Sequence, residues 1–188
     1  MKHREIYHQT NLPIFQNRMY RSAEEAQNCP TGNICLIENE KTGLIYNEAF
    51  DAGLLEYDTS YQNEQSYSQT FKKHMEQIAD LIETKIGNKK LIEIGCGKGK
   101  FLELLLSHGV DVIGFDPAYE GSNPSIRREY FKGNNKIRGN GLILRHVLEH
   151  IPEPVNFLKT LAKANGGEGL IYIEVPCLDW IRSRGAWF

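Results

Sequence analysis

From Leu91 onward, short apolar runs alternate with segments whose apolar residues recur every three or four positions. The runs 91–94, 110–115, 141–144 and 169–175 are mostly apolar, which predicts strands that are buried on both faces. Segment 100–108, and another that begins after Pro152, have the spacing of amphipathic helices. This alternation predicts an α/β fold with a doubly wound, mostly parallel sheet, whose strands all end at one edge.

The first part of the chain has a different pattern. Residues 1–35 are polar and show no sustained period, so we expect an irregular segment there, and apolar residues flank a polar turn at 38–43, which predicts a short hairpin. Segment 68–86 carries apolar residues at helical spacing and predicts a long helix. We therefore expect an N-terminal extension over residues 1–67, with the hairpin and a tyrosine-rich segment, and an α/β core over residues 68–188 that includes this leading helix.

The most informative stretch is the strand 91–94, which runs into Gly95, Gly97 and Gly99, while the next strand ends in Asp116. Glycines let backbone amides at the mouth of a helix approach a ligand, and an acid at the tip of the next strand can accept hydrogen bonds from two ribose hydroxyls. These features predict a nucleoside-containing cofactor. A dinucleotide fingerprint needs a glycine at position 100, where Lys100 stands, so a nicotinamide-dependent oxidoreductase is the weaker reading.

Segment 93–99 reads E-x-G-x-G-x-G and resembles the first motif of class I S-adenosylmethionine-dependent methyltransferases. Segment 144–151 is similar to the block that follows the fourth strand in many of them. The resemblance spans residues 91–176 and implies a Rossmann-like fold with S-adenosylmethionine as cofactor. The residues that it implies in cofactor binding are Glu93, Gly95, Cys96, Gly97, Gly99, Asp116, Pro117, Arg145 and His146.

A narrower resemblance is to the sugar C-methyltransferase-like group, through segments 43–51, 145–151 and 173–176. It implies a small-molecule substrate, such as a nucleotide-linked sugar. Relatives with zinc carry a C-x-x-C pair where this chain has Glu38 and Lys41, so we predict no metal. Such proteins also continue past an aromatic segment like 187–188, so the resemblance implies missing C-terminal strands and a truncated or abbreviated relative. The alternative is a catalytically incomplete domain with a binding or regulatory role.

Three side chains are candidates for catalysis. His146 is either a general base at the methyl-transfer locus or a hydrogen-bonding group at the strand end. Tyr61 and Tyr67 either take part in the chemistry or form a wall or lid around the positive sulfonium. Arg145 either meets the methionine carboxylate or a substrate phosphate, or is a solvated side chain, and Glu149 and His150 are expected to cap and pack at a helix start.

Composition limits the classes of partner and the location that we expect for this protein. The 188 residues carry a net charge of −2, so no overall electrostatic field attracts the protein to nucleic acid or to a membrane. The N-P-P-Y segment of enzymes that methylate base amines is absent, which also disfavours nucleic acid. No apolar run near membrane length and no signal-peptide core is evident, so we expect a cytoplasmic protein. An unprotected sheet edge after Val175 would allow a homodimer.

The four cysteines contribute little to the prediction. Cys29 and Cys35 lack the partners that a four-ligand zinc site needs. Cys96, between two motif glycines, is expected to pack rather than to act as a nucleophile. A disulfide framework is not expected in a cytosolic chain of this size.

Overall fold

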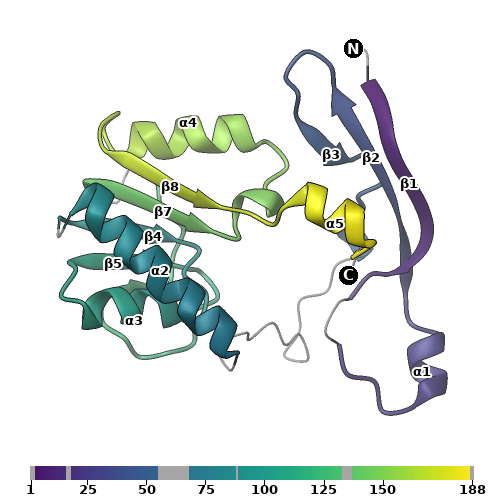
Figure 1. Cartoon of the computed structure of the whole chain (residues 1–188), viewed down its shortest axis with the longest axis horizontal. Helices are drawn as coiled ribbons and strands as arrows, with labels where there is room; N and C mark the ends of the chain where they lie inside the picture. The colour runs from purple at the N-terminus through teal and green to yellow at the C-terminus, as the bar shows by residue number, and fades with distance from the viewer. Residues whose placement is uncertain (1–2, 16–17, 55–67, 88, 133–136, 187–188) are drawn as a thin grey trace. The chain divides into compact units, whose positions relative to one another are not determined.

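The computed structural model describes residues 3–15, 18–54, 68–87, 89–132 and 137–186 (Figure 1). The chain divides into two compact units, formed by residues 1–64 and 65–187. Each unit is described by itself.

The N-terminal unit contains a three-stranded antiparallel sheet in the order β1-β2-β3. Its strands are β1 (His3–Pro13), β2 (Thr31–Asn39) and β3 (Ile45–Asn47), with a short helix α1 (Ala23–Gln27) and a 3-10 turn η1 (Ala52–Leu54). The predicted hairpin is confirmed: Ile37 pairs with Tyr46, and the Gly43 N–H donates to the Asn39 carbonyl at 2.8 Å.

The expectation that residues 1–35 are irregular is wrong. β1 pairs with β2 along most of its length, from His3 opposite Asn39 to Pro13 opposite Thr31. β1 has no buried residue, and only Leu36 and Ile37 are buried in β2. Backbone hydrogen bonds form this pair while most side chains stay in contact with water, so the sequence lacks the alternation that marks a half-buried strand.

The second unit is built on a five-stranded parallel sheet in the order β6-β5-β4-β7-β8. Its strands are β4 (Leu91–Ile94), β5 (Val112–Phe115), β6 (Ile126–Arg127), β7 (Gly141–Arg145) and β8 (Leu170–Glu174). The predicted parallel α/β fold is confirmed. The sequence pattern did not predict β6, because two residues are too few to show a period.

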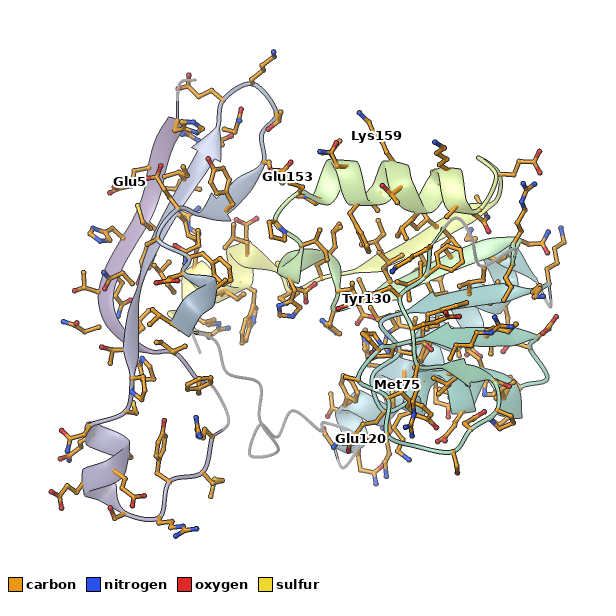
Figure 2. The ribbon with its side chains drawn as sticks, turned by 180° about the vertical axis from the view of Figure 1, so that it is seen from behind. Glu5, Met75, Glu120, Tyr130, Glu153 and Lys159 are labelled. Atoms are coloured by element: carbon orange, nitrogen blue, oxygen red, sulfur yellow. The ribbon has the colours of Figure 1, made fainter. Side chains whose placement is uncertain are left out.

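Helices cover both faces of this sheet (Figure 1). α2 (Gln69–Ile86) and α3 (Lys100–Ser107) pack on one face, and α4 (Pro154–Ala164) packs on the other. Met75 of α2 and Phe101 of α3 are buried, as is Leu161 of α4, whereas Lys159 points outward from α4 (Figure 2). The second unit also contains the 3-10 turn η2 (Leu148–His150) and the helix α5 (Leu178–Arg184).

The predicted long helix of residues 68–86 is confirmed as α2, and its ends follow from its sequence. The Ser68 hydroxyl accepts a hydrogen bond from the Phe71 N–H at 3.3 Å, which satisfies one of the free donors at the helix start. Gly87 ends the helix at φ +78°, a conformation that glycine adopts without steric cost.

Side chains alternate between the two faces of the sheet, and this alternation places three charged residues together. Ile143 and Tyr172 pack in the core on the α2 and α3 face. Because side chains two residues apart share a face, Arg145 and Glu174 also lie on that face, as does Glu93, which follows Leu91 by two positions. These residues occupy the carboxyl ends of the neighbouring strands β4, β7 and β8.

None of the helices in the described part of the chain is long and apolar enough to span a membrane. Trp180 of α5 is 57% exposed. Trp187 and Phe188 lie outside the described residues.

Candidate active site

The three glycines of the loop between β4 and α3 all have positive φ, at +70° for Gly95, +54° for Gly97 and +79° for Gly99. A Cβ on Gly95 would lie 2.5 Å from Val147 Cγ2, and one on Gly99 would lie 2.5 Å from Ile126 Cδ1. A side chain at either position would therefore force its neighbour to shift and would strain the backbone. The loop is thus a tight backbone turn that leads directly into α3.

The Asp116 carboxylate is bound to this loop. Its Oδ2 accepts a hydrogen bond from the Gly97 N–H at 2.8 Å, and its Oδ1 accepts one from the Ala118 N–H at 2.8 Å. A carboxylate offers about four acceptor sites, so each oxygen can still accept a hydrogen bond from a ligand hydroxyl. The structure therefore brings together the two features that the sequence singled out, while Pro117 follows Asp116 as an exposed residue.

Glu93 is a buried acid at the end of β4, with an exposed fraction of 3%. Its Oε2 has no hydrogen-bond partner among the residues that the structure describes. Burial raises the pKa of this carboxyl to about 8, the Arg145 charge acts to lower it, and the Asp116 charge raises it. Glu93 is thus largely protonated at neutral pH, and ionisation becomes easier when a cation binds beside it.

Arg145 is not the solvated side chain that one reading predicted, because only 8% of the side chain is exposed. Its Nε donates to Glu174 Oε2 at 2.6 Å, and its guanidinium carbon lies 4.3 Å from the centre of the Phe101 ring. Within the described residues its Nη2 is buried without a hydrogen-bond partner. A buried donor without a partner costs free energy, so the arrangement favours a ligand group that accepts from it.

His146 follows β7 in a left-handed backbone conformation, with φ +53°, which is uncommon for a residue other than glycine. Its Nδ1 lies 3.5 Å from Glu149 Oε1, and its Nε2 lies 3.5 Å from Glu174 Oε1. Hydrogen bonding to Glu149, and then to Glu174, raises the pKa of the imidazole to about 9. At neutral pH His146 is therefore an imidazolium that donates protons in hydrogen bonds.

The helix start expected around Glu149 and His150 is the single 3-10 turn η2. Glu149 contacts His146 there, which is a role that the sequence did not indicate. His150 is exposed. Tyr61 and Tyr67 lie outside the described residues, so their proposed roles stay predictions.

Two polar residues of this site were missed by sequence reasoning, Glu174 and His74. Glu174 lies at the end of β8 and binds Arg145, and its Oε1 is 2.6 Å from Nε2 of His74 on α2. Burial acts to raise the pKa of Glu174, but hydrogen bonds from His146, Arg145 and His74 hold it well below its usual range. The signal in the sequence was a single acid in the otherwise apolar run 170–175.

Cys96 packs as predicted. It is buried, and a Cβ on Gly114 of the neighbouring strand would lie 2.7 Å from its sulfur. Burial, with the charges of Glu93 and Asp116, raises the pKa of the thiol to about 12, so the thiolate needed for nucleophilic attack does not form. All four cysteines are free thiols.

Two further features lie between α2 and α3. A cavity of about 490 Å³ is lined by residues that include Lys72, Glu76 and Lys100. Asp80, Glu83 and His108 have potential metal-ligating atoms within 4.8 Å of one another. His108 binds Glu83 at 2.6 Å and Glu76 at 3.2 Å, so ion pairing accounts for the approach of His108 to Glu83.

A family model described as a methyltransferase domain matches residues 66–187. This is most of the chain and nearly the whole second unit. The chain belongs to this methyltransferase domain family. A comparison with curated proteins finds no match.

Methyltransferase domains of this family generally use S-adenosylmethionine, and the residues at the strand ends fit it. The amino-acid part of that cofactor carries an ammonium donor and a carboxylate acceptor. Glu93 Oε2 is a buried acceptor without a partner, and Arg145 Nη2 is a buried donor without one, within the described residues. Asp116 retains acceptor sites for the ribose hydroxyls. These groups thus match the amino-acid part and the ribose of the cofactor.

Proposed function

We propose that this methyltransferase domain binds S-adenosylmethionine and that its protein transfers the methyl group to a small molecule. One observation carries the proposal: the Gly97 N–H donates to Asp116 Oδ2 at 2.8 Å. This contact joins the glycine loop and the acid at the end of β5 into one site. When bound, the cofactor supplies an electrophilic methyl group on a positively charged sulfur.

The residues of the domain would then bind the cofactor and orient it. Asp116 accepts hydrogen bonds from the ribose, Pro117 lies beside the adenine, and the backbone at residues 95–99 follows the methionine part. Glu93 accepts from the ammonium group, and Arg145 donates to the carboxylate. Positioning of this kind is the main contribution that a protein makes to an in-line displacement with a good leaving group.

His146 has a more specific role in this proposal. As an imidazolium bound to Glu149 and Glu174, it cannot accept a proton at neutral pH. It can act as a general base only when the pH approaches about 9 or when substrate binding separates it from these carboxylates. The roles predicted for Tyr61 and Tyr67, as wall or catalytic residues, stay part of the proposal on the ground of the sequence alone.

A nucleotide-linked sugar is the acceptor that we propose. Its support is the resemblance of segments 43–51, 145–151 and 173–176 to sugar C-methyltransferases. The net charge of −2 gives no support to a nucleic-acid or membrane substrate. The second candidate is a domain that binds the cofactor without turnover, and the involvement of His146 in two ion pairs favours it.

The test is thermal unfolding with and without S-adenosylhomocysteine, the demethylated product. We expect the melting temperature to rise for the wild type, because a ligand at about 100 times its Kd adds about 2.7 kcal/mol to the free energy of unfolding. Asp116→Ala should abolish the rise. Asp111→Ala is the matched control, since Asp111 is exposed and lies just before the opposite end of β5.

A wild-type protein that folds but shows no shift would contradict cofactor binding. A shift without methylated product, after incubation of the full-length protein with S-adenosylmethionine and nucleotide-linked sugars, would favour the second candidate over the enzyme.

A further inference from the structure

We propose that Glu174 is a positioning residue of the cofactor site, which acts through Arg145 on the amino-acid end of the cofactor. The inference rests on the proposed function. Neither the sequence motifs nor the family match assigns a role to Glu174.

The carboxylate of Glu174 receives contacts from two other elements. Its Oε2 accepts from Arg145 Nε at 2.6 Å, and its Oε1 lies 2.6 Å from Nε2 of His74 on α2. Only 14% of the Glu174 side chain is exposed. A short contact between a carboxylate and a guanidinium, partly shielded from water, is among the stronger polar interactions in a protein.

These contacts restrict the orientation of Arg145. The strand register places Arg145 opposite Glu174, so the ion pair forms across the β7–β8 ladder. The guanidinium is planar, and its central carbon lies over the Phe101 ring, 4.3 Å from the ring centre. One hydrogen bond at Nε and one cation–π contact hold a side chain that otherwise has many rotamers.

The donors at Nη2 are the ones that matter for the ligand. Arg145 Nη2 is buried and has no partner in the described part of the chain. Glu93 Oε2, on the neighbouring strand β4, is likewise buried without a partner among the described residues. With Nε bound to Glu174, the guanidinium keeps its Nη2 edge available for the carboxylate of the cofactor.

The backbone of Glu174 also contacts the loop that follows β7. Its carbonyl oxygen accepts from the His146 N–H at 2.9 Å, at the residue with φ +53°. A purely structural ion pair would explain these contacts as well. The two roles differ in one respect. Loss of a structural pair would lower the affinity for every ligand equally, whereas loss of a positioning residue would lower the affinity only for ligands that carry the group that Arg145 binds.

The experiment compares two probes by calorimetric titration of the full chain. S-adenosylhomocysteine carries the amino-acid group, and 5′-methylthioadenosine has the same adenosine and sulfur without it. Glu174→Gln removes the charge that holds Arg145, so we expect its affinity for S-adenosylhomocysteine to fall by about tenfold or more. Its affinity for 5′-methylthioadenosine should be unchanged.

Glu168→Gln is the matched control, because it makes the same chemical change at an exposed residue just before β8. If Glu174→Gln fails to fold, Glu174→Asp keeps the charge but moves the carboxylate away from Arg145, and it should show the same selective loss. Equal losses for both probes, or no loss for S-adenosylhomocysteine, would overturn the inference while leaving the proposed function intact. A wild-type protein that binds neither probe would overturn the proposed function itself, and the inference with it.

Discussion

Gly95 and Gly97 show how two glycines in one loop can differ in what they tolerate. Both have positive φ, so any side chain at either position strains the backbone. A Cβ at Gly95 would also lie 2.5 Å from Val147 Cγ2, whereas one at Gly97 would meet no atom within 4 Å. The first glycine is therefore required by packing as well as by conformation.

Gly95→Ala should accordingly destabilise the domain more than Gly97→Ala. The left-handed conformation costs about 1–2 kcal/mol in either variant. Forced overpacking against Val147 should add about 1–3 kcal/mol in Gly95→Ala alone. Urea unfolding of both variants measures the difference, and equal losses of stability would show that the Val147 contact is relieved without cost.

At the scale of elements, α2 and α3 are joined by a histidine as well as by their apolar residues. His108, at the C-terminal end of α3, contacts Glu83 at 2.6 Å and Glu76 at 3.2 Å, both on α2. The hydrogen bond to Glu83 is the main cause that raises the pKa of His108 above 6.5. The charged imidazolium is therefore favoured in the folded state.

This linkage predicts a pH-dependent contribution to stability. Because the folded-state pKa is the higher one, the contribution is fully present below about pH 6.5 and disappears as the pH rises through the raised value. Under mildly acidic conditions His108→Gln should lower the free energy of unfolding, by less than about 1 kcal/mol. At about pH 10 the same substitution should leave the free energy of unfolding unchanged. Urea unfolding at both pH values is the measurement, with His150→Gln, at an exposed position, as the control.

A loss that is the same at both pH values would contradict this explanation. It would mean that the His108 ring stabilises the helix pair by packing rather than by charge.

At the scale of the whole molecule, β8 is the element that could bring two chains together. It pairs with β7 on one side and, within the described residues, with no strand on the other. Leu170 is 53% exposed and Ile171 is 46% exposed. A strand edge with free backbone groups and apolar side chains is a ready template for pairing with another chain.

We propose that two copies pair through this edge. Sedimentation velocity should then show a dimer for the wild type, and Ile171→Lys should shift it toward the monomer, because a charge on an edge strand opposes pairing. Leu81→Lys, which places the same charge on an exposed apolar position of α2, should leave the dimer intact. A wild-type monomer at all concentrations would rule out this interface.

The sequence alone determined the α/β order of the second unit, the helix of residues 69–86 and the pairing of the glycine loop with Asp116. Each of these depends on local patterns: apolar runs, helical spacing, and glycines at the end of a strand. Because parallel strands end at the same edge of a sheet, the order of the strands was enough to bring Asp116 to the loop.

Only the tertiary structure decided the network around Glu174. Arg145 and Glu174 are 29 positions apart, and His74 and Glu174 are 100 positions apart, so strand register and helix packing had to place them before they could meet. The same holds for β1 and β2, whose pairing rests on backbone hydrogen bonds that leave no apolar pattern. Local side-chain patterns can be recognised in the sequence, whereas contacts between distant polar groups exist only once the chain has folded.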